Sequence, residues 1–580
     1  MLRNISFLIC LVFGLGVPFM FAQQKNIQEQ KTAVPDLAHL RAMTARFAPT
    51  RIEVNTSKLS AGDRQVLVKL IEAARILNHV FMQQYWSGDL ALYSELQKDK
   101  SSLGAARLHY FWINKGPWSA LDANKAFLPE VPPEKLPGAN FYPENMTKEN
   151  FEQWVAGLPA KDQEQAKSFF TVIRWKSGNN GELQSLPYSE EYKADLTRAA
   201  KLLHEAAVLT GNASLKKFLD SRADAFLSND YYESDLAWMD LDAPIDVTIG
   251  PYETYNDEIF GYKAAFEAYV TLRDDEETAK LSAFTSHLQE IENNLPLDAK
   301  YRNPKLGAAA PIRVVDEIIA TGDGAHGIQT AAYNLPNDDH VVQQKGSKRV
   351  MLKNVQEAKF HSVLLPIASR TLTKSARADV RFEPFFTHIL AHELMHGLGP
   401  HQIKVDGRDT TPREEIKELY GAIEEAKADV TGLYALQYMM DHAAEMGLSK
   451  LVSPGEAGER QLYTTYLASS FRTLRFGLNE AHGKGMAVQF NFYLDKGGFV
   501  DNGDGTFSVD VPKMKKAVAE LDHDLLTLEA QGDYAGAKKM LDELGVIRPS
   551  LQKALDHLNG IPTDIEPIYV TAEELAGKER

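Results

Sequence analysis

The spacing of apolar residues along the chain predicts a mainly helical protein. Apolar side chains recur every three or four positions in residues 65–80, which places them on one face of a helix. The same spacing returns in residues 192–209 and again in residues 385–446. Residues 23–60 are polar and poor in aromatic side chains, so we expect them to form a loosely held arm.

Shorter stretches favour extended chain. β-branched residues and prolines mark residues 236–255, and a second β-leaning region runs from residues 311–323 through 348–355. Residues 497–511 predict a hairpin, because their Asn, Asp and Gly positions suit turns with positive φ. The proline-rich residues 127–143 predict a rigid loop.

The first residues have the pattern of a signal peptide. Arg3 precedes an apolar run that is short for a membrane span, and Ala22 supplies a small residue before the polar Gln23. We therefore expect residues 1–22 to be cleaved and the protein to be exported, to a bacterial periplasm or outside the cell. An uncleaved membrane anchor is the less favoured alternative.

Charge and cysteine content narrow the possible partners and metal ligands. The formal net charge of −16 disfavours binding to nucleic acid or to anionic membranes. Cys10 is the only cysteine and lies in the expected leader, so the mature chain can form neither disulfides nor thiolate ligands. A metal ion must then be held by nitrogen and oxygen atoms.

The stretch HELMHGLGPH, which begins at His392, is the strongest candidate for chemistry. A helix here would project His392 and His396 from one face, one turn apart, with Glu393 close enough to act as a general base. Gly397 would then help to end the helix. The alternative is that two histidines share a helix by chance, which happens in on the order of a few per cent of sequences this long.

A second helical stretch, residues 418–436, carries acidic side chains that could complete the site. Glu424 and Glu425 lie there, and one carboxylate added to two histidines gives three protein ligands and an open position, as in catalytic zinc sites. The alternative is a solvated helix face on which Glu424, Glu425 and Asp429 pair with Lys427.

HELMHG followed by EEAKAD resembles the dipeptidyl peptidase III family of zinc exopeptidases, whose signatures are H-E-x-x-G-H and E-E-x-[RK]-A-[ED]. Further blocks in the same order are similar to that family, among them GPYETYNDEIFGYKAAFEAYV, YNLPNDD, MLKNV and NEAHGKGMAVQF. SNDYY and GLGPH are most similar to the dipeptidyl-peptidase-III-like portion of plant nudix-fused hydrolases. No nudix motif is visible in this sequence.

The resemblance implies a role for each matching residue. It implies one zinc ion per chain, held by His392, His396 and Glu425, with Glu393 as the general base. Two further carboxylates, Glu424 and Asp429, would hold the histidines in the right tautomer. The remaining matches are Tyr255 and His482, which would assist the oxyanion, and Glu253, Asn334 and Asn337, which would bind the substrate's N-terminal ammonium.

The resemblance also implies the architecture: a mainly α fold with a smaller mixed β part, in two lobes with a cleft, the zinc site on the helical lobe. We expect residues 23–273 to form mostly a lower mixed α/β lobe and residues 274–530 mostly the helical, zinc-binding lobe. Residues 318–362 would return to the lower lobe, and residues 531–580 would form a C-terminal helical segment.

The implied activity is release of dipeptides from short peptides with a free N-terminus. The alternatives are a zinc hydrolase with the same site and another substrate, and a secreted peptide-binding protein with an inactive site. This chain has one residue fewer between its motif histidines than the family signature, which leaves the placement of Glu393 open. The sequence does not place the C-terminal arginine that contacts substrate in the family; Lys538, Lys539 and Arg548 are candidates that no motif supports. The oligomeric state stays open.

Overall fold

The computed structural model describes residues 34–176, 181–306, 311–449 and 451–579. The expected signal peptide and Cys10 lie outside these residues. Within the described part of the chain, none of the helices combines the length and the apolar character needed to cross a bilayer.

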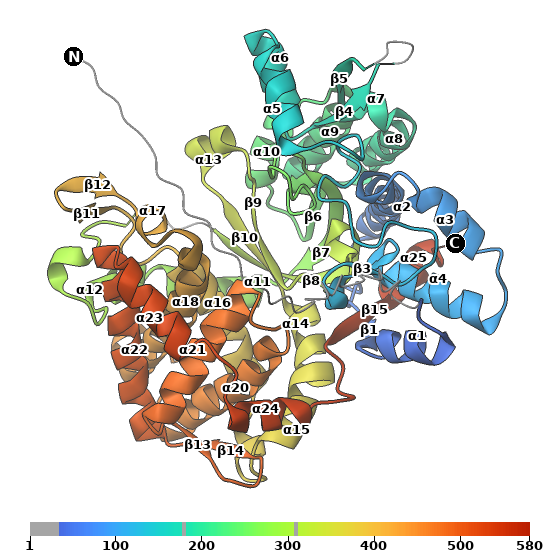
Figure 1. Cartoon of the computed structure of the whole chain (residues 1–580). Coiled ribbons are helices and arrows are strands. Elements are labelled where there is room, and N and C mark those ends of the chain that lie inside the picture. Colours follow the sequence, from blue (N-terminus) through green and yellow to red (C-terminus); the bar gives the residue numbers. More distant parts are fainter. Residues whose placement is uncertain (1–33, 177–180, 307–310, 450, 580) are drawn as a thin grey trace, which may run out of the picture.

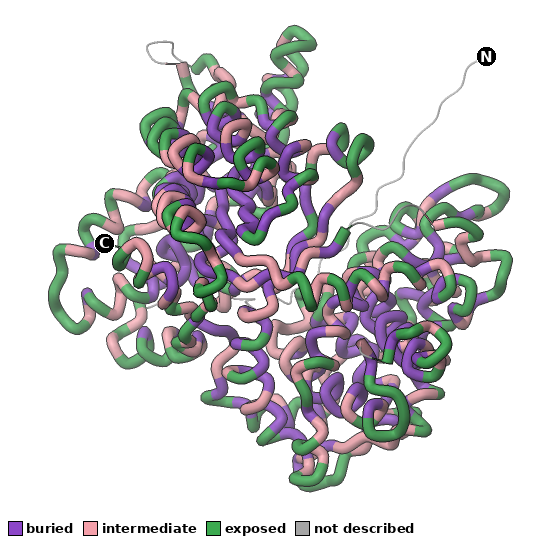
Figure 2. The backbone as a smooth tube through the Cα atoms, turned by 180° about the vertical axis from the view of Figure 1, so that it is seen from behind, coloured by how far each residue is buried: buried purple, intermediate pink, exposed green. Residues whose placement is uncertain are grey.

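Two lobes make up the molecule, each around its own apolar core, as the burial pattern in Figure 2 shows. We call them the sheet lobe and the helical lobe; they lie to the upper right and the lower left in Figure 1. Helices dominate and strands form the smaller part, so the predicted fold class is confirmed.

A five-stranded sheet organises the sheet lobe. Its order is β6 (Ile245–Glu253), β7 (Ala265–Arg273), β8 (Ile312–Gly322), β10 (Lys348–Leu352) and β9 (Ala332–Leu335). β8 and β10 are parallel, and the other neighbours are antiparallel. Helices α11 and α12, which belong to the helical lobe, lie between β7 and β8 in the sequence. The chain therefore returns from the helical lobe to complete the sheet with β8, β9 and β10.

The predicted helix at residues 65–80 exists and is longer, as α2 (Ala61–Tyr85). The Ser60 side chain caps it by accepting a hydrogen bond from the backbone N–H of Asp63. Its buried face, including Leu70 and Leu77, packs against β7 and β8. The helix predicted at residues 192–209 also exists and begins at Lys193.

The other helices of the sheet lobe are α1 (Leu37–Thr44), α3 (Asp89–Leu96), α4 (Ser102–Asn114), α5 (Lys148–Ala156), α6 (Ala160–Lys167), α7 (Tyr188–Glu191), α8 (Lys193–Leu209), α9 (Ala213–Ser228), α10 (Tyr232–Met239), α13 (Asp339–Lys345) and α25 (Val570–Ala576). Short strand pairs join β2 (Trp118–Ser119) to β3 (Lys125–Ala126) and β4 (Thr171–Trp175) to β5 (Leu183–Pro187).

The helical lobe contains α11 (Asp275–Thr285), α12 (Leu288–Asn293), α15 (Leu365–Thr371), α16 (Phe382–Met395), α17 (Pro412–Ile416), α18 (Tyr420–Asp441), α19 (Ala443–Met446), α20 (Glu456–Leu474), α21 (Ala481–Asp495), α22 (Val511–Gln531), α23 (Tyr534–Glu543) and α24 (Pro549–Asp556). Helix α14 (Lys353–Lys359) leads into it from the sheet. Two hairpins lie on its surface, β11 (Ile403–Val405) with β12 (Arg408–Thr410) and the predicted one, β13 (Phe499–Asp501) with β14 (Phe507–Val509).

The expected loose arm at residues 23–60 is wrong for its described part, which begins at residue 34. After α1, strand β1 (Phe47–Ile52) pairs in parallel with β15 (Asp564–Tyr569), so Phe47 lies opposite Asp564 and Ile52 opposite Tyr569. The C-terminal segment, expected to be helical, therefore ends with a strand and α25 after its two helices. Local polarity could not reveal a strand whose partner lies at the other end of the chain.

The structure also tests the predictions of extended chain at residues 236–255 and of a loop at residues 127–143. Residues 236–255 are extended only from Ile245 onward, because Leu236 to Met239 belong to α10, which packs against α9. Residues 127–143, all of them described, form no helix, as predicted for a proline-rich loop.

Candidate metal centre and catalytic site

Three helices meet at the site, and two glycines allow their close approach. A Cβ added at Gly432 of α18 would lie 3.2 Å from the backbone nitrogen of His392 on α16. A Cβ added at Gly485 of α21 would lie only 2.8 Å from the carbonyl oxygen of Ala422 on α18. Because a side chain at either position would push the helices apart, these glycines bring the functional side chains of α16, α18 and α21 within reach of each other.

The two motif histidines and Glu425 converge on one point. His392 lies in α16 and His396 at its C-terminal end, and their Nε2 atoms are 3.2 Å apart. Glu425 Oε2 lies 3.3 Å from Nε2 of His392 and 3.8 Å from Nε2 of His396. Ligands about 2.0–2.2 Å from a tetrahedral zinc are separated by roughly 3.3 Å, so these three atoms have the spacing of zinc ligands.

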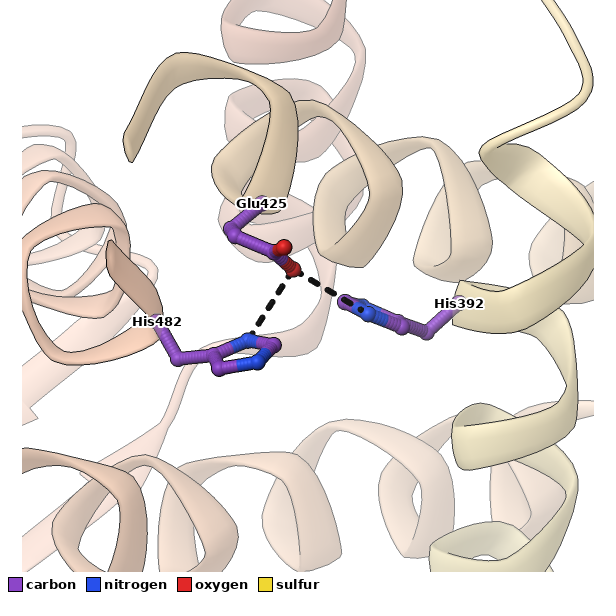
Figure 3. A group of neighbouring side chains, drawn as sticks. All are labelled: His392, Glu425 and His482. Atoms are coloured by element: carbon purple, nitrogen blue, oxygen red, sulfur yellow. Dashed lines mark ion pairs between the residues drawn. The ribbon is translucent and has the colours of Figure 1, made fainter. Parts of the chain in front are cut away.

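His482 is the third histidine of the group. Its Nδ1 lies 3.0 Å from the same Glu425 Oε2, and His392, Glu425 and His482 together offer atoms that could hold a metal ion, as Figure 3 shows. The imidazole comes from the start of α21 and is more than half exposed. The structure thus brings His482 to the site and offers two candidates, His396 and His482, for the third ligand.

The orientation of these groups fits a cation at their centre. Glu425 Oε2 is buried and lies 3.0 to 3.8 Å from nitrogens of three imidazoles, and none of the described residues forms a hydrogen bond of good geometry with it. Nδ1 of His392 lies 2.9 Å from Asp429 Oδ1, and Nδ1 of His396 lies 2.7 Å from Glu424 Oε1. With a proton on each Nδ1, the two Nε2 lone pairs face one another and the carboxylate, an arrangement that a bound cation stabilises.

Asp429 and Glu424 therefore lie behind the histidines, as the resemblance implies. Gln489 donates a hydrogen bond to the second oxygen of Asp429, at 3.0 Å. Lys427 is buried, and its Nζ lies 2.9 Å from Glu424 Oε1. Although burial opposes it, the charge of Lys427 and the contact with His396 hold the pKa of Glu424 well below its usual range. The alternative of a solvated helix face is wrong for these two carboxylates and for Lys427.

Neighbouring charged groups also shift the pKa values of His392 and Glu425 at the candidate metal site. Although burial lowers it, the nearby Asp429 and Glu425 raise the pKa of His392 well above its ordinary value. The contacts with His392 and His482 lower the pKa of Glu425 in spite of its burial. Glu393 is partly buried, directly after His392 on α16, and no described residue forms a hydrogen bond or ion pair with it. It keeps a free carboxylate beside the ligand set.

The sheet lobe supplies the remaining predicted residues at the end of β6 and around β9. Glu253 ends β6; burial and then the charge of Asp323 raise its pKa to about 7, partly offset by a hydrogen bond from Asn337. Asn337 also donates to the carbonyl of Tyr252 at 2.9 Å. Asn334 lies exposed on β9. Sequence reasoning missed Asp323, since nothing in its local motif marks it.

Tyr255 lies within electrostatic range of carboxylates from both lobes. Its side chain is 81% exposed. The charge of Glu253 is the main cause that raises its pKa, followed by burial of part of the ring and by the charges of Asp323, Glu393 and Glu425. Because Glu393 and Glu425 belong to the helical lobe, Tyr255 of the sheet lobe lies within electrostatic range of the candidate metal centre.

The candidate basic residues near the C-terminus do not reach this region. Lys538 pairs with Asp542 and Arg548 with Asp495, and neither they nor Lys539 line the cavity that extends to His482. Arg472 and Arg475 line that cavity instead.

Comparisons with known proteins agree with this geometry. The family model described as "Peptidase family M49" matches residues 144–405. The chain is 42% identical over 585 aligned residues to Nudix hydrolase 3 of Arabidopsis thaliana, covering 92% of this chain and 74% of the relative.

Two solved structures are similar over almost their whole length. One is dipeptidyl-peptidase III from a Corallococcus strain (52% identity, TM-score 0.79, 94% of this chain and 99% of that chain). The other is DPP III from Caldithrix abyssi (45% identity, TM-score 0.88, 92% of this chain and 100% of that chain). The chain therefore belongs to peptidase family M49, and it is a metallopeptidase of the dipeptidyl peptidase III type.

Proposed function

We propose that this peptidase depends on zinc and releases dipeptides from the N-terminus of short peptides. The observation that carries the proposal is the convergence of His392 Nε2, His396 Nε2 and Glu425 Oε2, separated by 3.2, 3.3 and 3.8 Å. Nitrogen and oxygen donors at this spacing suit a catalytic zinc ion. Asp429 and Glu424 fix the two imidazoles from behind.

Zinc held by these residues would polarise the scissile carbonyl and lower the pKa of a water molecule. Glu393, free of other partners among the described residues, takes the proton of the attacking water and later delivers it to the leaving amine. The Tyr255 hydroxyl, protonated under the influence of the surrounding carboxylates, donates a hydrogen bond to the developing oxyanion. His482, beside Glu425, assists at the same oxygen.

Recognition of the free N-terminus would set the position of the cut. Glu253, with Asn337 bonded to the same strand end and Asn334 on β9, offers an acceptor set for an ammonium group. Once the ammonium is fixed, only the bond that lies at the metal can react, and two residues between anchor and metal yield a dipeptide.

Glu393→Gln tests the base. We expect zinc content to stay near one per chain while hydrolysis of a dipeptidyl-arylamide falls at least about a hundredfold, the usual contribution of a general base. Unchanged turnover would refute the mechanism. Chelation should abolish wild-type activity, and added zinc should restore it.

Blocking the substrate tests the exopeptidase assignment. An N-acetylated peptide removes the ammonium and should not be cleaved, whereas cleavage at internal bonds would assign the same site to another hydrolase. A chain that binds peptide and zinc but never turns over would be a binding protein.

We also propose that the enzyme acts after export. The support is the leader-like pattern of residues 1–22 and the lack of cysteine in residues 23–580. Amino-terminal sequencing of the protein from the periplasm or medium should find Gln23 at the start.

A further inference from the structure

Lys427 is a buried cation behind the candidate metal centre, and the proposed mechanism gives it no role. It lies on α18, two positions after Glu425, and its side chain is 1% exposed. Its ammonium contacts the carbonyls of Met395 and Leu398 at 3.0 and 3.2 Å and Oε1 of Glu424 at 2.9 Å. Because an ammonium group carries three N–H donors, these three partners use all of them.

The two carbonyls belong to the end of α16, where His396 caps the helix and Met395 and Leu398 lie on either side of it. The backbone N–H of His396 still donates to the carbonyl four residues back, at 3.3 Å, whereas the next two N–H groups donate three residues back. The helix therefore ends at this histidine. Carbonyls in the last turn of a helix lack partners within the helix and favour a cation, which Lys427 supplies from the neighbouring helix.

The third contact of Lys427 acts on the imidazole itself. Oε1 of Glu424 lies 2.9 Å from the ammonium and 2.7 Å from Nδ1 of His396, so one oxygen links the two groups. The buried carboxylates of Glu529 and Asp522 on α22 lie within electrostatic range of the same ammonium. Three carboxylates thus share this cation, and without it they would repel one another away from solvent.

One residue therefore holds His396 in two ways, through the backbone on either side of it and through the carboxylate behind its ring. We propose that Lys427 is a positioning residue: it fixes the imidazole of His396 as a metal ligand and thereby sets the zinc affinity of the site. It contacts neither the imidazole nor Glu425, and acts through Glu424 and the end of α16. This inference rests on the proposed function, in which His396 is a ligand.

Lys427→Met tests it, because methionine keeps an unbranched side chain of similar length and loses the charge and the N–H donors. We expect zinc affinity, measured by competition with a chelator, to fall about ten- to a hundredfold, the usual effect of removing a contact behind a metal ligand. Lys427→Arg keeps the charge and should restore most of the affinity.

Lys263→Met is the matched control for a general loss of stability. Lys263 is also buried and donates three hydrogen bonds, to the carbonyls of Ala166 and Ser168 and to the hydroxyl of Thr171, at 2.7, 2.9 and 2.8 Å, but it lies in the sheet lobe. Both methionine variants should lower the unfolding temperature of the zinc-free protein, and only Lys427→Met should weaken zinc binding.

A double-mutant cycle tests the route through Glu424. Glu424→Gln should weaken zinc binding by itself, and the variant with both changes should lose less affinity than the product of the two single losses, because both residues act on the same imidazole. If Lys427→Met does not fold, the double variant, which leaves no unpaired charge at this contact, is compared with Glu424→Gln, and a further loss below about tenfold is expected.

Four results would overturn the inference: wild-type zinc affinity in Lys427→Met, an equal loss in Lys263→Met, no recovery in Lys427→Arg, or losses that multiply in the double variant. Zinc binding by the wild-type chain, measured in the same titrations, tests the proposed function separately. A wild-type chain that binds no zinc would overturn both, whereas tight wild-type binding with an unaffected Lys427→Met would overturn the positioning role alone.

Discussion

Gly485→Ala tests whether the close packing of α21 on α18 positions the catalytic side chains. The new Cβ would lie 2.8 Å from the carbonyl oxygen of Ala422 and 3.1 Å from the nitrogen of Ala426, whereas ordinary contacts begin at 3.4 Å. Because both obstacles are backbone atoms, the helices must part by roughly half an ångström, at a cost of about 1–3 kcal/mol for overpacking. His482 lies on α21 and would move away from Glu425.

We expect kcat/KM for a dipeptidyl-arylamide to fall about ten- to a hundredfold while zinc content stays near one per chain, because small displacements at a reacting centre are costly. Gly421→Ala is the matched control on the same interface. Its Cβ would lie 3.7 Å from that of Ala481, an ordinary contact, and alanine there favours the helix by up to about 1 kcal/mol. If Gly485→Ala retains the activity and thermal stability of the control, the argument from helix packing is wrong.

Three further predictions concern the ligands and the pH dependence. His396→Ala should abolish stoichiometric zinc, measured by elemental analysis, whereas His482→Ala should retain zinc and lose turnover; the reverse pattern would make His482 the ligand. Asp429→Asn should weaken zinc affinity about ten- to a hundredfold in a chelator competition, because the contact of 2.9 Å with His392 Nδ1 loses its charge; equal affinities would remove this role. Since burial raises the pKa of Glu253 to about 7, its anionic form is lost as the pH falls through 7, and KM for peptides should rise roughly tenfold per pH unit below that value; a flat profile would contradict the ammonium anchor.

The geometry of the candidate metal site could be predicted because its signal is local. His392 and His396 share one helix and Glu424, Glu425 and Asp429 share another, and helical periodicity fixes which of them face the same way. Once α16 packs on α18, these faces bring the histidines and the carboxylates together. The resemblance supplied the sheet-lobe residues, whose motifs alone are ordinary turns and strand ends.

The missed features depend on contacts between distant parts of the chain. β1 and β15 are separated by almost the whole sequence, and neither has an apolar alternation strong enough to be recognised alone. Arg472 and Arg475 follow the polar pattern of a helix surface, and only the folded chain shows that they line a cavity. Asp323 likewise raises the pKa of Glu253 only because the fold brings the two residues close together.

The pairing of β1 with β15 has a consequence for biosynthesis. Strand β1 completes its hydrogen bonds only with β15, a segment that is made long after it, so this strand pair cannot form until most of the described chain has been made. Contacts of such long sequence separation slow folding, and the unpaired edge of β1 stays exposed to other chains in the meantime. Removing residues 564–579 would therefore leave β1 without its partner and the newly made N-terminal region prone to aggregation, although the removed residues include none of the proposed catalytic groups.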